Sequence, residues 1–196
     1  MLFRLGLTGS IGMGKSTTAL MFADEGCAVW DADAAVHRLY AQGGKAVGPI
    51  REIFPDAIAN NAVSRDRLRE IIATDKTALP LIEAVVHPLV GQDREIFAQS
   101  CTDLIGVFDI PLLYETGACA EMDAVACVRI PGDEQRRRVL ARGTMTAADL
   151  ERILSRQMPN DEKCARSDYV IDTDTLDHAR AQVRAIVRAI KDKIDA

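Results

Sequence analysis

Short apolar runs alternate with longer segments of helical spacing along this chain of 196 residues. The apolar runs predict five buried strands, at Leu2–Thr8, Cys27–Asp31, Leu104–Ile110, Ala124–Ile130 and Tyr169–Asp172. The clearest helical segment runs from Leu176 to Ile194, where apolar side chains recur at steps of three and four residues. Because strands that alternate with helices form parallel sheets covered on both faces, we expect a three-layer α/β fold.

Two segments between the predicted strands are polar and helical rather than strand-like. Residues 34–100 show helical spacing and no convincing strand, and residues 131–167 form a second such segment before the last strand. Ligands of open α/β sheets bind beyond the carboxyl ends of the strands, so we expect residues 34–100 to be an insertion over the active site. The chain is then a single unit with a core of residues 1–33, 101–130 and 168–196.

The composition is that of an ordinary globular protein, with 48% hydrophobic and 27% charged residues. The 24 Lys and Arg residues and 29 Asp and Glu residues leave a net charge of −5, which argues against a general nucleic-acid binder. No apolar run approaches the roughly 18 residues of a membrane span, and the first residues predict no cleaved signal. We therefore expect no nucleic-acid or membrane partner. We also expect small-molecule substrates and a monomer or weak homo-oligomer.

The five cysteines predict a reducing compartment. None forms a CxxC pair, and an odd number cannot pair completely within one chain. Cys27 and Cys127 adjoin predicted strands, where a free cysteine usually serves as a small buried apolar residue. Nothing in the spacing resembles a zinc site, so we expect a cytoplasmic protein with structural cysteines.

The first predicted strand runs directly into a phosphate-binding loop. Residues 9–16 match the pattern GxxxxGK[ST], the P-loop, and a helix-compatible run follows them. Backbone N–H groups of such a loop converge on phosphate oxygens, and the next helix adds its positive N-terminus. Lys15 is expected to reach the β- and γ-phosphates of ATP, and the Ser16 hydroxyl to ligate Mg²⁺. The expected ATP-binding residues here are Gly9, Gly12, Met13, Gly14, Lys15, Ser16 and Thr17.

Carboxylates follow two further predicted strands. Asp31 and Asp33 lie at the end of the second strand, where a carboxylate can orient an attacking hydroxyl and accept its proton. One of them can instead cap the helix that follows. We assign the role of base to Asp33 and treat Asp31 as structural or linked to Mg²⁺. Asp109 lies near the end of the third strand, where a carboxylate can hold Mg²⁺ through water.

Taken together, these blocks resemble the dephospho-coenzyme A kinase family. The resemblance rests on the P-loop, Asp31-Ala32-Asp33, His87-Pro88-Leu89, Pro111-Leu112-Leu113-Tyr114-Glu115 and Val170-Ile171-Asp172, which occur in the order that the family shows. Members transfer a phosphoryl group from MgATP to the 3′-hydroxyl of the ribose of dephospho-coenzyme A, the last step of coenzyme A synthesis. They have a P-loop kinase core, a helical substrate-binding domain and a helical lid, which would correspond to the core, to residues 34–100 and to residues 131–167.

The resemblance implies roles for individual residues. It makes Asp33 the base toward the ribose hydroxyl, and it places His87, Leu112, Leu113 and Glu115 in the acceptor pocket. Arg138 and Arg142 fall where the family has its lid arginines, which would bind ATP or stabilise the transferring phosphoryl group.

The chain departs from the family pattern at two places. Thr173-Asp174-Thr175 replaces the Asn-Asp-Gly-like turn that often follows the last strand near the adenine. Ile153 stands where the family often has an arginine four residues before the residue matching Gln157, and Arg152 and Arg156 are its neighbours.

Other P-loop proteins provide two alternatives. Another nucleotide or nucleoside kinase would share the P-loop, Mg²⁺ and arginines, and would differ in its acceptor pocket, which here needs apolar surface for the pantetheine tail. A regulatory NTPase fits less well, because no guanine-reading NKxD element occurs.

The charge of the chain is unevenly distributed. Residues 129–166 carry nine Lys and Arg against six Asp and Glu, so this segment is +3 and the rest of the chain is −8. Such local positive charge suits two polyanionic substrates.

Overall fold

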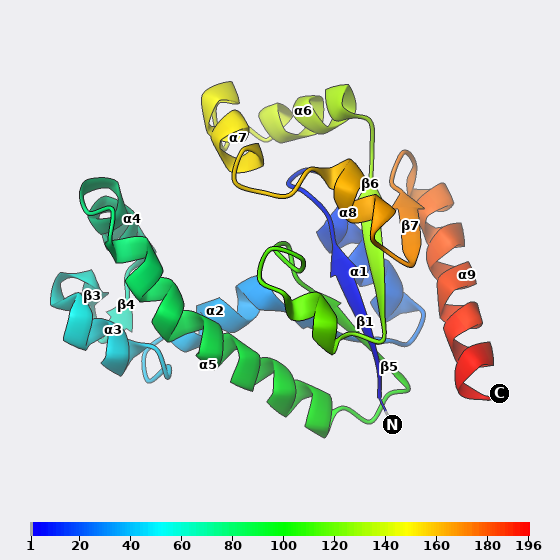
Figure 1. The fold of residues 1–196 in the computed structure, drawn as a ribbon, viewed down its shortest axis with the longest axis horizontal. Helices are drawn as coiled ribbons and strands as arrows, with labels where there is room; N and C mark the ends of the chain where they lie inside the picture. Colours follow the sequence, from blue (N-terminus) through cyan, green and yellow to red (C-terminus); the bar gives the residue numbers. More distant parts are fainter. Residues whose placement is uncertain (1) are drawn as a thin grey trace. The chain divides into compact units, whose positions relative to one another are not determined.

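The structure, a computed structural model, describes residues 2–196. Five strands form one sheet in the order β2-β5-β1-β6-β7. They are β1 (Phe3–Thr8), β2 (Ala28–Asp31), β5 (Ile105–Asp109), β6 (Ala124–Arg129) and β7 (Tyr169–Asp172). Figure 1 labels four of them, β1, β5, β6 and β7. The central strand β1 pairs in parallel with β5 on one side and with β6 on the other. The predicted α/β fold with five parallel strands is confirmed, and each strand end lies within one residue of its predicted position.

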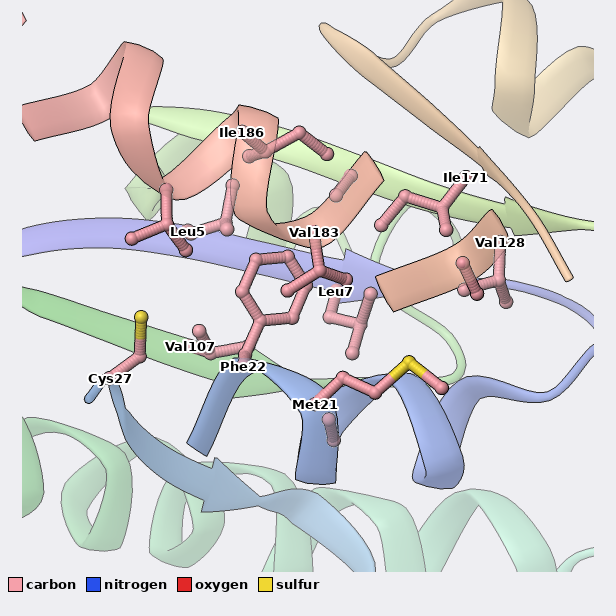
Figure 2. Packing of buried hydrophobic residues seen from close by; sticks show 14 of the residues in the cluster. Leu5, Leu7, Met21, Phe22, Cys27, Val107, Val128, Ile171, Val183 and Ile186 are labelled. Atoms are coloured by element: carbon pink, nitrogen blue, oxygen red, sulfur yellow. The ribbon is translucent and has the colours of Figure 1, made fainter. Parts of the chain in front are cut away.

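One face of the sheet is covered by α1 (Lys15–Asp24) and α9 (Leu176–Ile194) (Figure 1). Leu5 and Leu7 of β1 point to this face, because alternate side chains of a strand lie on the same side. Figure 2 shows them packed with Phe22 of α1 and Val183 of α9, and all four side chains are completely buried. The apolar stripe predicted for the last helix therefore covers the sheet.

The opposite face is covered by α8 (Asn160–Ala165) and by the chain that leaves β5, which includes a 3-10 turn, η2 (Ala118–Glu121). Leu113 is completely buried, and its side chain lies directly over Gly6 of β1. Cys127 of β6 faces Cys164 of α8, with 3.4 Å between the two Sγ atoms. Both thiols are free and buried. The prediction that Cys127 acts as a buried apolar residue is confirmed, as it is for the buried Cys27.

The segment between β6 and β7 is helical, as predicted. It contains α6 (Gly132–Ala141), α7 (Ala147–Leu154) and α8. A capping box between Thr146 and Asp149 begins α7, because the side chain of each accepts a hydrogen bond from the backbone N–H of the other. In the described part of the chain, residues 2–196, no helix is long and apolar enough to cross a membrane.

Residues Asp31–Ser100 form a second compact unit, while the rest of the chain forms the first. The second unit consists of α2 (Ala32–Tyr40), α3 (Val47–Ile53), a 3-10 turn η1 (Pro55–Ala57), β3 (Ile58–Ala59), β4 (Ala62–Val63), α4 (Arg65–Thr74) and α5 (Ala78–Ser100). Its helices bury a separate apolar core around Leu39, Ile50, Leu68 and Ile82. The helical character predicted for this stretch is confirmed.

The prediction that residues 34–100 contain no strand is wrong, because β3 and β4 form a short antiparallel hairpin. Asn60 and Asn61 connect the two strands with φ angles of 50° and 58°, the left-handed conformation that a two-residue hairpin turn requires. Strands of two residues are too short to show alternation of polar and apolar side chains. The adjacent asparagines, which tolerate this conformation, are the signal that identifies the hairpin.

Candidate active site

The P-loop follows the central strand of the sheet. The strands that flank β1, namely β5 and β6, both come later in the chain, so the end of β1 is a point at which the strand order reverses. Such switch points are where open α/β sheets bind ligands. Gly14 adopts the left-handed conformation (φ 88°) and immediately precedes α1, which begins at Lys15. The first N–H groups of α1 have no partner within the helix and are available to phosphate oxygens.

Helix α6 packs against the tip of the P-loop. Gly12 has φ 79°, and a Cβ there would overlap the side chain of Val139 in α6. The side-chain amide of Gln135, also in α6, donates a hydrogen bond of 2.7 Å to the carbonyl of Ile11. Gln135 is buried, and the sequence offered no sign of this contact. The base of the predicted lid segment is therefore part of the wall of the phosphate site.

Lys15 and Asp109 form an ion pair at the carboxyl ends of β1 and β5. The carboxylate of Asp109 is almost completely buried, with 1% of its side chain exposed. Ser16 is exposed in the first turn of α1. A hydroxyl and a carboxylate oxygen are hard donors of the type that Mg²⁺ prefers. The predicted positions of Lys15, Ser16 and Asp109 thus lie on neighbouring elements of one unit.

A surface hollow adjoins the P-loop on the side of α9. It is lined by Gly14, Thr17, Thr18 and Met21, by Arg138 of α6, and by residues 173–176 with Ala179. The guanidinium of Arg138 donates to the Thr173 carbonyl at 2.9 Å and pairs with Glu134 at 2.8 Å. The hydroxyl of Thr173 donates to the Met13 carbonyl at 2.8 Å, so the loop after β7 is fixed to the P-loop.

The second predicted lid arginine occupies a different environment. Arg142 is the residue after the last turn of α6 and is exposed, and it does not line the hollow beside Arg138. Much of the positive charge in this segment is paired with carboxylates of the same segment. Arg136 pairs with Glu151, and Arg137 with Glu134.

The predicted residues Asp31, Asp33 and His87 lie in the second unit. The carboxylate of Asp31 accepts a hydrogen bond of 2.8 Å from the backbone N–H of Ala34 and caps α2, the capping alternative that the sequence had left open. Asp33 is exposed in the first turn of the same helix. His87 is exposed on α5, immediately before Pro88.

The chain that leaves β5 carries the other predicted acceptor-side residues. Leu112 is 40% exposed, whereas Leu113 is completely buried, so only Leu112 offers its side chain to solvent. The carboxylate of Glu115 accepts a hydrogen bond of 2.8 Å from the N–H of Met158 and pairs with Lys163 at 2.9 Å. Burial acts to raise the pKa of Glu115, but these hydrogen bonds outweigh it and hold the pKa below its ordinary value.

Two side chains of α8 that the sequence did not single out contact the predicted site. The side-chain oxygen of Asn160 accepts a hydrogen bond of 2.9 Å from the backbone N–H of Ser10 in the P-loop. Lys163 is completely buried and reaches the segment that contains Glu115. In the sequence Lys163 contributes to the basic charge of residues 129–166, and nothing in its local pattern distinguishes it from a solvent-exposed lysine of a polar helix.

The chain is similar to known proteins over nearly its whole length. A family model described as dephospho-CoA kinase matches residues 3–178. The dephospho-CoA kinase of Ruegeria pomeroyi is 69% identical over 191 residues, which cover 97% of each chain. That of Cereibacter sphaeroides is 58% identical over 195 residues, covering 99% of this chain and 98% of the relative. The crystal structure of TT1252 from Thermus thermophilus has a TM-score of 0.85 and 29% identity, covering 96% and 97% of the two chains.

The matched residues include the P-loop, the whole of the second unit and residues 111–115. They therefore contain every sequence block on which the resemblance rested. The resemblance inferred from the sequence is confirmed, and the chain belongs to the dephospho-CoA kinase family.

Proposed function

We propose that this kinase transfers the γ-phosphoryl group of ATP to the 3′-hydroxyl of the ribose of dephospho-coenzyme A, which gives coenzyme A and ADP. One observation carries the proposal: the P-loop lies at the switch point of the sheet in a chain whose similarity to dephospho-CoA kinases covers both units. Phosphoryl transfer depends mainly on positioning and charge stabilisation, so the residue roles follow from the site's geometry.

The phosphates of ATP are proposed to bind the P-loop and the N-terminus of α1. Lys15 would exchange its Asp109 partner for β- and γ-phosphate oxygens, because both partners are anionic and lie at the same strand ends. The nucleoside part of ATP would occupy the hollow beside Gly14 and Thr173, where Arg138 is in reach of the nucleotide. Arg142 is exposed at the end of α6, and we assign it a role at the phosphates when the segment closes.

The oxygen donors near the P-loop fit Mg²⁺. The Ser16 hydroxyl and the Asp109 carboxylate would hold the ion, directly or through water, together with phosphate oxygens. Within residues 2–196 no three His, Cys, Asp or Glu side chains form a group that could hold a metal ion. When bound, the ion neutralises charge that develops on the phosphates. Asp31 is the weaker candidate ligand because it caps α2.

The acceptor hydroxyl is proposed to transfer its proton to Asp33. As the 3′-oxygen bonds to the γ-phosphorus, the bond from that phosphorus to the β,γ-bridging oxygen breaks, ADP leaves, and the Asp33 carboxylate takes the proton. The position of Asp33 supports this role, because its side chain is exposed two residues after the end of β2, a strand of the central sheet. We assign His87 and Glu115 to polar contacts with dephospho-coenzyme A, and the exposed Leu112 to its apolar part. The buried Leu113 would support that surface from below.

The proposal is tested by incubating the purified protein with MgATP and dephospho-coenzyme A. We expect coenzyme A and ADP in equal amounts, with the new phosphate on the 3′-oxygen by mass spectrometry and phosphorus NMR. A matched reaction with a dephospho-coenzyme A that lacks the 3′-hydroxyl of the ribose should yield no phosphorylated product. Phosphoryl transfer only to other nucleotides or nucleosides would contradict the proposal.

A further inference from the structure

Helix α8 connects strand β6 with two segments that carry proposed site residues, the P-loop and residues 111–115. Asn160, in its first turn, accepts a hydrogen bond from the Ser10 N–H of the P-loop and donates one of 3.1 Å to the Val128 carbonyl of β6. One turn later, the Lys163 ammonium donates a hydrogen bond of 2.9 Å to the carbonyl of Pro111. The same ammonium lies 2.9 Å from the carboxylate of Glu115. All of these residues belong to the first unit.

Lys163 is unusual because its side chain is 0% exposed. Lysine is almost never completely buried unless its charge is compensated, since the removal of an ammonium from water is costly. Here the compensation comes from residues four positions apart in one segment, the Pro111 carbonyl and the Glu115 carboxylate. A single cation therefore fixes both ends of the segment 111–115 against the sheet.

The anchored segment determines which side chain faces solvent. Leu113 is held against Gly6, and its neighbour Leu112 is turned outward. Thr8, the last residue of β1, also donates its hydroxyl to the Pro111 carbonyl at 3.2 Å. The position of Leu112 therefore depends on contacts from both β1 and α8.

A second pair of contacts fixes the same segment to the chain after α8. The hydroxyl oxygens of Tyr114 and Ser167 lie 2.9 Å apart, and the Arg166 guanidinium stacks over the Tyr114 ring at 4.7 Å from its centroid. The Arg166 side chain is 49% exposed, whereas the Lys163 side chain is completely buried. We therefore expect Lys163 to contribute most to the position of the segment.

We propose that Lys163 is a positioning residue for the acceptor: it touches neither ATP nor the reacting atoms, and it holds residues 111–115 in the conformation that binds dephospho-coenzyme A. This inference rests on the proposed function only in its choice of acceptor. An error of about 1 Å in the position of a substrate-binding group can reduce activity about 100-fold. The loss of Lys163 should therefore affect acceptor binding and turnover without a comparable effect on ATP binding.

The test uses the whole protein with Lys163→Met, which keeps most of the unbranched side chain and removes the charged ammonium group. We expect the KM for dephospho-coenzyme A to rise about tenfold or more, and the Kd for ATP to change less than about twofold. The control is Lys191→Met, the same substitution at an exposed position of α9, which should change neither constant. Equal increases in both constants, or an unchanged acceptor KM in folded protein, would overturn the proposal.

Two further variants, Glu115→Gln and the double variant with Lys163→Met, separate a positioning role of Lys163 from a simple loss of protein stability. Lys163→Met leaves Glu115 with an uncompensated charge, and the double variant Lys163→Met/Glu115→Gln removes that charge, so it should fold if the single variant does not. Because Lys163 also binds the Pro111 carbonyl, the acceptor KM of the double variant should exceed that of Glu115→Gln alone but fall below the value expected if the two single effects multiplied. If the fold-changes that the two single substitutions cause in the acceptor KM simply multiply in the double variant, the proposal is contradicted.

Hydrogen exchange provides a readout that does not depend on the identity of the acceptor. In Lys163→Met we expect faster exchange in peptides covering residues 111–117 and unchanged exchange in peptides covering residues 18–24 of α1. If the wild-type protein fails to phosphorylate dephospho-coenzyme A yet this exchange pattern appears, the proposed function fails while the anchoring by Lys163 stands. If the acceptor is phosphorylated and exchange in residues 111–117 does not change, the positioning role is wrong.

Discussion

Lys15 of the P-loop and Asp109 of β5 form an ion pair in which the carboxylate is almost completely buried. A buried carboxylate needs a compensating charge, because its transfer out of water is costly. Lys15 therefore has a partner in the protein besides the phosphates that we propose it binds. The pair links the stability of the P-loop to that of the neighbouring strand.

Replacement of this lysine should affect both stability and chemistry. Lys15→Met is expected to lower the free energy of unfolding by about 3 kcal/mol, because Asp109 loses a cationic partner, and to abolish phosphoryl transfer. Urea denaturation and a coupled ADP assay measure the two effects. Lys15→Met/Asp109→Asn should recover much of the stability and none of the activity. An unchanged unfolding midpoint in the single variant would show that the pair contributes nothing to folding.

Asp31 should tolerate replacement by another capping residue. Its carboxylate accepts the Ala34 N–H, and Asn can accept the same bond, so Asp31→Asn should change the free energy of unfolding by less than about 0.5 kcal/mol. Asp31→Ala removes the cap and should cost about 1 kcal/mol. Both are measured by urea denaturation. A large loss of activity in Asp31→Asn, with normal stability, would instead place Asp31 at the metal or the substrate.

Asp33 should show the opposite behaviour. It is exposed in the first turn of α2, so Asp33→Asn should leave stability nearly unchanged. Loss of the proposed base should lower kcat about 100-fold or more, since general base catalysis typically contributes 10²–10⁴-fold. The Kd for ATP, measured by calorimetry, should stay within about twofold. A loss confined to ATP binding would contradict the role of base.

The sheet and the P-loop could be predicted because both are local properties of the sequence. Each strand is a continuous apolar run, and the loop is a fixed pattern that follows one of them. The helix cap at Asp31 was also accessible as an alternative, since an aspartate before a helical run is a local signal. The family assignment required only the order of such local blocks.

The contacts that complete the site depend on residues far apart in the chain. Lys163 lies in a short polar helix, and only its partner Pro111, 52 positions earlier, explains why it is buried. Gln135 likewise contacts Ile11, 124 positions away. The sequence pattern around such residues is that of exposed polar helices. Strand order was inaccessible for the same reason, because it is determined by packing between segments distant in the sequence.

The cysteines should fall into two classes of reactivity. Burial raises the pKa of Cys27 to about 11, and it also raises the pKa of Cys127 and Cys164. The thiolate is the reactive form, so these three should react with a disulfide reagent only after unfolding, whereas the less buried Cys101 and Cys119 should react first. Counting modified thiols against time by mass spectrometry checks this. Cys101→Ser should remove one fast site, and rapid modification of all five would contradict the expected burial.

Glu115 should contribute to stability in a pH-dependent way. Burial opposes ionisation of its carboxyl, but the hydrogen bonds from Lys163 and the Met158 N–H outweigh burial and hold the pKa below its ordinary value of 4.5. A carboxyl whose pKa is lowered by folding stabilises the protein above its unfolded pKa, and this stabilisation is lost as the pH falls through the folded pKa. The carboxylate is therefore expected to stabilise the fold at neutral pH and to stop doing so in acid.

Glu115→Gln tests this by removing the charge with little change of shape. The variant should be less stable than the wild type near neutral pH, and the difference should narrow as the pH falls from about 4.5, the ordinary pKa, through the lower pKa of the folded wild-type carboxyl. Urea midpoints of the two proteins between about pH 7 and pH 3 measure the difference. The control is Asp161→Asn, at an exposed carboxyl of α8. Its difference in stability from the wild type should not narrow comparably as the pH falls. A difference that is constant with pH would show that the pair with Lys163 does not depend on the charge of Glu115.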